Sequence, residues 1–154
     1  MQRTRKFDIN TVLGTSQLNI LTRHIHSFVT EFQVEIYTPP YLSGVNANNR
    51  PTNMVLSLTD LTADGSTFTL SFTSPAGGQT PTVALYYGGF ITHSVHMGQR
   101  MVMLDTTGWQ AGAQEQTLTV TMPPNGNIAP PGPYVVYVLV DGVPGVGQFV
   151  SVAV

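Results

Sequence analysis

The chain has 154 residues and a formal net charge of −2, and charged residues make up 9% of it, against about 25% in a typical globular domain. This length fits one domain, and the weak negative charge leaves no electrostatic footprint for nucleic-acid binding. The chain contains no cysteine, which excludes disulfides, thiolate metal sites and a cysteine nucleophile.

Residues 1–30 are expected to form an N-terminal segment or tail. Up to residue 23 this segment holds four basic residues against the single acid Asp8, which favours a solvated tail, with a tether to an acidic surface as the alternative. One strand is expected near residues 17–22. No apolar stretch follows the basic start, so no signal peptide is visible. The longest apolar run, residues 134–140, is far shorter than the roughly 18 residues of a membrane-spanning helix.

From Glu31 the sequence alternates between apolar and polar residues, which is typical of strands with one buried face. The first strand is predicted to end at Pro39, because proline cannot donate to a sheet. Further strands are expected over residues 54–60 and 67–74. Asp64 and Gly65 between them predict a hairpin turn, since the two-residue turns that join hairpins need positive φ.

The C-terminal half supplies the remaining strands. They are predicted over residues 83–87, 90–95, 100–105, 116–122, 134–140 and 147–154. The segment 134–140 is apolar on both faces and should be a central strand. Turn signals recur every 8–12 residues and no long helical period appears, so an all-β sandwich is predicted, of about seven to eight antiparallel strands.

Three stretches of this sequence together resemble one family. They are residues 34–42 (VEIYTPPYL) continued by 49–51 (NRP), residues 92–100 (THSVHMGQR), and residues 122–134 (MPPNGNIAPPGPY) running into 143–144 (VP). In this order they resemble the C-terminal early-set, immunoglobulin-like domain of the galactose oxidase and fungal glyoxal oxidase-like copper radical oxidases. The resemblance covers residues 31–154, which it implies are one C-terminal β-sandwich domain.

The resemblance implies a role for one residue, His93. In these oxidases a loop of the C-terminal domain reaches into a seven-bladed propeller, and the histidine at this position ligates copper. The resemblance assigns the remaining ligands, a histidine and two tyrosines, to the propeller, together with a cysteine cross-linked to one tyrosine. This chain has no propeller repeats and no cysteine, so it is expected not to be an enzyme on its own. No cofactor is expected in the isolated chain, and copper only where a propeller-type partner completes the site.

Four histidines offer alternatives for metal binding, because imidazole is a good copper or zinc ligand but a lone imidazole is not a site. His24 and His26 would share one face of a strand, and His93 and His96 would lie on opposite faces. Three interpretations are open: an idle His93, a copper site completed by a partner, and a combined site of all four histidines.

Other groupings of side chains have mainly structural interpretations. Trp109 with Tyr41, Tyr86 and Tyr87 could stack on a sugar, although core or loop packing is the simpler interpretation. The three methionines near residue 100 are expected to fill the core and turns rather than bind copper; they are Met97, Met101 and Met103. No serine-nucleophile motif, paired carboxylates or phosphate-binding loop is evident.

Two classes of function therefore compete. In the first, the chain is a structural, self-assembling or partner-binding module that has kept the fold without the chemistry. In the second, it is a fragment or subunit that completes an oxidase copper site through His93. Low charge and a face that a propeller would cover predict a homo-oligomer, a filament or a partner-bound subunit. The resemblance implies an extracellular location.

Overall fold

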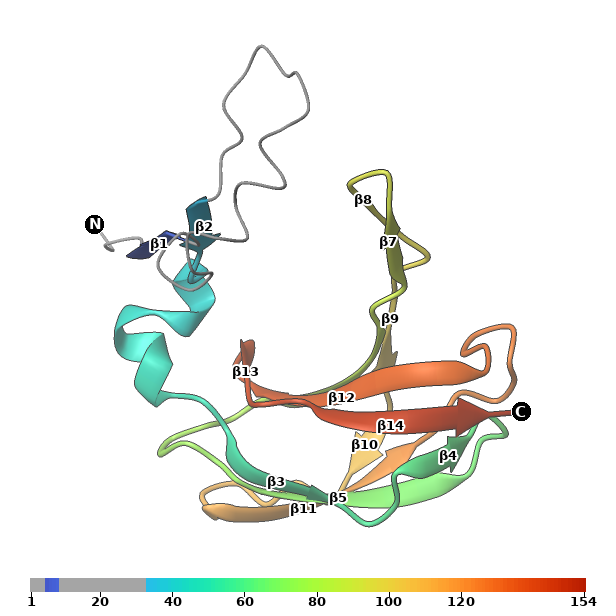
Figure 1. Cartoon of the computed structure of the whole chain (residues 1–154). Coiled ribbons are helices and arrows are strands. Elements are labelled where there is room, and N and C mark those ends of the chain that lie inside the picture. The colour runs from blue at the N-terminus through green and yellow to red at the C-terminus, as the bar shows by residue number, and fades with distance from the viewer. Residues whose placement is uncertain (1–4, 9–32) are drawn as a thin grey trace. The chain divides into compact units, whose positions relative to one another are not determined.

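The computed structural model describes residues 5–8 and 33–154 (Figure 1). The chain divides into two compact units, Met1–Pro39 and Pro40–Val154. In the first unit, β1 (Arg5–Asp8) pairs antiparallel with β2 (Gln33–Ile36) in a two-stranded sheet of their own. The strand expected near residues 17–22 lies outside the described residues, as do His24 and His26.

The second unit is a sandwich of two sheets. The smaller sheet has the strand order β10 (Thr106–Thr107), β11 (Glu115–Thr121), β5 (Thr67–Thr73), β3 (Thr52–Leu56). The larger sheet has the order β4 (Asp60–Thr62), β14 (Gln148–Ala153), β12 (Gly132–Val140), β6 (Pro81–Tyr87), β9 (Arg100–Leu104), with β13 (Val143–Pro144) on β12. Two short 3-10 helices precede β3, η2 (Pro40–Leu42) and η3 (Gly44–Asn48). The predicted all-β sandwich is confirmed, and the one parallel pairing in it joins β4 to β14.

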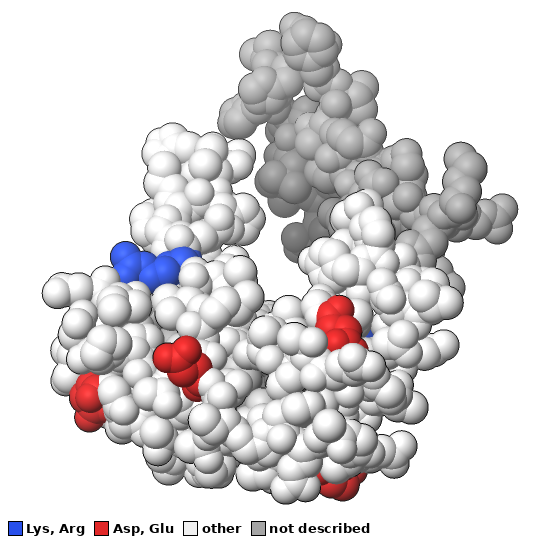
Figure 2. Space-filling view, turned by 180° about the vertical axis from the view of Figure 1, so that it is seen from behind, with Lys and Arg blue, Asp and Glu red and all other residues white. Residues whose placement is uncertain are grey.

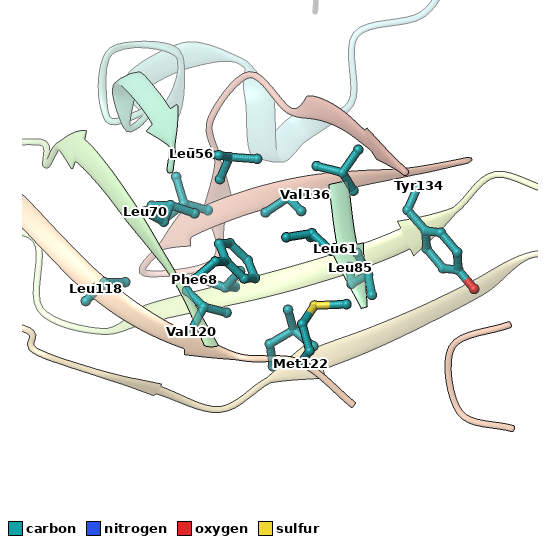
Figure 3. Close-up of a cluster of buried hydrophobic side chains, with 14 of the residues drawn as sticks. Leu56, Leu61, Phe68, Leu70, Leu85, Leu118, Val120, Met122, Tyr134 and Val136 are labelled. Atoms are coloured by element: carbon teal, nitrogen blue, oxygen red, sulfur yellow. The ribbon is translucent and has the colours of Figure 1, made fainter. Parts of the chain in front are cut away.

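The core lies between the two sheets and follows the period-2 pattern of the sequence (Figure 3). In β5 and β11 the apolar residues point inward and the threonines outward, because successive side chains of a strand face opposite sides. β12 lies between β14 and β6 in the larger sheet, which confirms the prediction of a central strand there. The largest of the fully buried side chains are Tyr134, Phe72, Leu70, Leu85, Leu118, Val83, Val120, Val136, Val138 and Val140.

The predicted hairpin turn at Asp64 and Gly65 is wrong. The turn itself forms: Gly65 has a φ of 80° and the Ser66 amide donates to Asp64 Oδ1 at 2.8 Å. It connects β4 of the larger sheet to β5 of the smaller one, however, so its flanking strands do not pair. The single strand expected over 54–60 is likewise two strands, because the chain changes sheets between β3 and β4.

Candidate functional site

A separate hairpin carries the THS motif. Strand β7 (Phe90–Thr92) pairs antiparallel with β8 (Val95–Met97), and the pair projects away from both sheets of the sandwich (Figure 1). We call residues 90–97 the hairpin arm. A single strand over 90–95 was the expectation from sequence, and it is wrong, because the chain reverses at His93 and Ser94.

The turn at the tip of the arm holds two residues in a left-handed conformation. His93 has a φ of 53° and Ser94 a φ of 60°. Thr92 pairs with Val95, so only these two residues connect the strands, and positive φ at both is the signature of a type I′ turn. Such turns normally carry asparagine or glycine, because a Cβ raises the energy of this conformation. Non-glycine residues held in it are concentrated at functional sites.

The imidazole of His93 is oriented by its neighbour. A hydrogen bond of 2.8 Å joins Thr92 Oγ1 and His93 Nδ1, and the ring is exposed. When Nδ1 carries the proton and donates to Thr92, the Nε2 lone pair is free for a metal. Metal-binding histidines in proteins usually have their other ring nitrogen fixed in this way.

Apolar side chains cover the rest of the arm. Ile91 is 67% exposed, Phe90 58%, Val95 53% and Met97 42%. Four large apolar side chains on an eight-residue projection form a surface that favours a protein partner over water.

The outer face of the larger sheet is also apolar, with a groove of about 700 Å³ running across it. We call this surface the apolar sheet face. Its lining residues include Ala84, Tyr86, Met101, Met103, Val135, Tyr137, Leu139 and Phe149. Met101 is 61% exposed and Met103 56%, so their predicted role as core filler is wrong. Their strand β9 is an edge strand of the larger sheet, and alternate residues on it face outward.

Charged residues make up 9% of the chain, and most of the surface that the described residues present in Figure 2 carries neither acids nor bases. Arg50 lines the groove, and its guanidinium is hydrogen-bonded to the backbone. Nε donates to the Pro144 carbonyl at 2.9 Å and Nη2 donates to the Gly145 carbonyl at 3.1 Å. A partner on this face would meet apolar surface and very little charge.

The proposed sugar-stacking group does not come together. Trp109 stacks on Phe72, with ring centroids 6.4 Å apart, and Tyr87 packs against Tyr134 at 5.2 Å. Of these four aromatic residues, Tyr41 and Tyr86 line the groove, and Trp109 and Tyr87 do not. The packing interpretation of Trp109 is confirmed.

Comparison with known families identifies the fold. The family described as Galactose oxidase-like, Early set domain matches residues 50–152 of this chain. The chain belongs to this family. The resemblance seen in the three motifs is therefore confirmed.

The relatives of this early-set domain are oxidases. The chain is 28% identical over 149 residues to an aldehyde oxidase of Arabidopsis thaliana and 34% identical over 147 residues to an aldehyde oxidase of Vitis pseudoreticulata. Each match covers 94% of this chain but only 24% and 28% of the relatives. The chain thus spans about a quarter of the length of the curated relatives that it matches.

A solved structure agrees with the sequence relatives. A fungal alcohol oxidase of the AA5 family, in complex with copper, superposes with a TM-score of 0.61 at 29% identity. The match covers 80% of this chain and 25% of the oxidase. The likeness is therefore to one domain of a much larger protein.

Side chains able to ligate a metal are dispersed in the part of the chain that the structure describes. Among the described residues, no three histidine, cysteine or carboxylate side chains converge as a metal site would require. His96 lies opposite Ile91 in the arm, one pair below the turn. The idea of a four-histidine site also involves His24 and His26, which lie outside the described part of the chain.

Sequence reasoning predicted a loop at His93 and a face that a propeller would cover, but not the hairpin form of the arm or the strands that make up the apolar sheet face. A usable signal for the arm was present, since Gly88 and Gly89 precede it and Gly98 follows it, and glycines in a strand pattern mark bends. The apolar sheet face gave no comparable signal. An exposed apolar strand face and a buried one have the same sequence pattern. Only the structure shows whether a second layer packs against the face.

Proposed function

We propose that this early-set domain docks onto a propeller-type protein body through the hairpin arm and the apolar sheet face. His93 then supplies one ligand of a copper site that the other body completes, in the same polypeptide or in a second one. The observation that carries the proposal is the strained His93–Ser94 turn at the tip of an apolar projection. Exposed apolar side chains, strain and an oriented imidazole have a common explanation if the arm is buried in a partner.

The domain is inert alone under this proposal. Copper would supply the redox chemistry when bound, since the fungal alcohol oxidase that this chain resembles is a copper complex. The chain's own contribution is positional: His93 presents Nε2, Thr92 holds Nδ1, and the apolar residues of the arm exclude water around the tip. The relatives are more than three times as long as this chain, which leaves ample length for the completing body.

Copper retention in a reconstituted complex tests the proposal. The domain is mixed with the remainder of a related aldehyde oxidase from which the early-set domain has been removed, copper is added, and the complex is separated by size. We expect one copper per complex, lost in His93→Ala and kept in His96→Ala, a matched loss of an exposed imidazole from the same arm. Copper retained equally in both variants, or no complex, would contradict the proposal.

A second candidate function is self-assembly through the apolar sheet face. The observation that favours it is the exposure of Phe149, Met101 and Met103 on one sheet, since apolar patches of this kind also mark contacts between copies. The two functions differ in their ligand: self-assembly requires neither copper nor His93.

The proposal places the domain outside the cell, in line with the resemblance. Nothing in the site calls for nucleic acid. None of the helices in the described ranges is long and apolar enough to cross a bilayer, and the proposed partner is a protein surface.

A further inference from the structure

The arm continues a ribbon that begins in the larger sheet. In the β6–β9 pair Tyr87 faces Arg100, and in the β7–β8 pair Phe90 faces Met97. Both pairs belong to the same register, so the two strands run without insertion from the sheet to the tip. Gly88 and Gly89 on one strand lie between these pairs, opposite the segment 98–99 on the other.

The ribbon bends at a pair of glycines. Gly89 has a φ of 66° and Gly98 a φ of 72°, and the register places them opposite each other. A Cβ on Gly89 would overlap the carbonyl oxygen of Met97, whereas one on Gly98 would lie 3.7 Å from the Phe90 ring. The two strands therefore approach too closely at Gly89 for any side chain. We call this pair the elbow.

An arginine fastens the ribbon directly below the elbow. Arg100 Nη1 donates to the carbonyl of Asn127 at 2.8 Å and to that of Ile128 at 2.7 Å. These are charge-assisted hydrogen bonds, which are stronger than neutral ones. The loop that accepts them is itself fixed, because Ala129 is fully buried and its amide donates to the Asn125 carbonyl.

We propose that Gly89 and Arg100 are positioning residues that fix the direction of the arm before any partner binds. The close contact between Gly89 and the Met97 carbonyl restricts how the ribbon can bend. The hydrogen bonds of Arg100 attach the strand below the bend to the 127–128 loop of the sandwich. The arm is then a preset projection and not a loop that orders on docking, which lowers the entropic cost of binding. The purpose of this device rests on the proposed function, but its existence does not.

The direction of the arm can be measured in the isolated domain. The chain has no native cysteine, so His96→Cys and Thr119→Cys supply the only two attachment points for spin labels, one on the arm and one on β11. Pulsed electron–electron double resonance between the two labels should give a single narrow distance distribution in the otherwise unchanged domain. Arg100→Gln should broaden it by about twofold, as expected when a fixed segment becomes mobile, and Arg100→Lys should restore part of the sharpness. Gly89→Ala should shift its mean.

A matched control separates sterics from backbone strain. Gly112 has a φ of 81°, but a Cβ there would meet nothing within 4 Å, so Gly112→Ala adds the strain of a positive φ without a clash and should leave the distance unchanged. The unfolding midpoint of Arg100→Gln should stay near that of the parent, which shows that the body is intact. A broad distribution in the parent domain, or one that Arg100→Gln and Gly89→Ala leave untouched, would overturn the inference.

The outcomes also separate this inference from the proposed function. If the arm is fixed but the reconstituted complex holds no copper, the inference about the elbow stands and the proposed copper role is wrong. If copper binds through His93 but the arm is mobile in the parent domain, the copper role stands and the inference about the elbow is wrong.

Discussion

At the tip of the arm, two side chains hold a conformation that glycine would adopt more readily. His93 and Ser94 both have positive φ, and the proposed function gives a role to His93 alone. Ser94 therefore offers a way to relieve the turn without removing the imidazole.

Ser94→Gly should stabilise the arm by up to about 1 kcal/mol, because glycine has no Cβ to oppose a positive φ. Hydrogen exchange at the amides of residues 90–97 should slow. Ser151→Gly, on β14 in extended backbone, is the control and should instead lower stability by roughly 0.5–1 kcal/mol. Faster exchange in Ser94→Gly would show that the turn is not strained.

We expect the phenol of Tyr134 to make the free energy of unfolding fall at alkaline pH. Burial raises the pKa of Tyr134 above its usual value, with a further rise from Tyr87 and an opposing effect from Arg100. A raised pKa in the folded state means that the neutral phenol, which donates to the Pro130 carbonyl at 2.8 Å, is favoured by folding. This contribution is complete below about pH 10, the value for an unperturbed tyrosine, and is lost as pH rises through the folded-state pKa.

Tyr134→Phe should therefore lower the free energy of unfolding by about 1 kcal/mol at pH 8, through loss of the hydrogen bond, and flatten the decline above pH 10. Urea unfolding from pH 8 to pH 11 measures both effects. Tyr41→Phe, at an exposed position, should leave the pH dependence as it is in the parent. An unchanged alkaline decline in Tyr134→Phe would mean that other groups cause it.

At the scale of elements, alternation in the sequence predicted the strands that build the core. β5 and β11 were predicted to within a few residues because apolar and polar residues alternate in them, and β12 because its segment is apolar on both faces. Alternation says nothing about pairing, which depends on distant strands. For this reason the change of sheet between β3 and β4, and the reversal at His93, were not predicted.

The candidate site was even less accessible from sequence. His93 was singled out by family resemblance rather than by its chemistry, since a lone imidazole carries no signal. The strained turn, the bond to Thr92 and the elbow depend on backbone geometry. Gly88, Gly89 and Gly98 in the sequence hinted at a bend but could not give its direction.

The arm should be dispensable for folding, because none of the buried core residues lies within 88–99. Tyr87 and Arg100 face each other, so replacing residues 88–99 by Asn-Gly would close β6 onto β9 with a two-residue turn. We expect the free energy of unfolding to change by less than about 1 kcal/mol, while docking to the propeller-type body is lost. Global unfolding of this variant would show that the arm belongs to the core.

At the scale of the whole molecule, low charge and the apolar sheet face lead us to expect self-association in solution. The isolated chain should associate as its concentration rises, since few charges oppose contact between copies. Phe149, which lines the groove of the apolar sheet face, is 79% exposed.

Phe149→Lys should weaken self-association at least about tenfold, which corresponds to roughly 1.4 kcal/mol, because a lysine on the apolar sheet face would have to be desolvated. Sedimentation velocity over a range of concentrations measures it. Val55→Lys makes the same change of charge on β3 of the smaller sheet, and should have little effect. Equal effects of both variants would assign the association to net charge, and a parent chain that stays monomeric would remove self-assembly as a function.

The most direct test of the copper role is to ask whether a nitrogen of this chain binds the metal. The domain is produced with ¹⁵N-histidine, combined with the unlabelled propeller-type body and loaded with Cu(II), and the complex is studied by pulsed electron paramagnetic resonance. We predict a ¹⁵N coupling from a directly bound imidazole, absent in His93→Ala and present in His96→Ala. A copper signal with couplings to ¹⁴N alone would contradict the account.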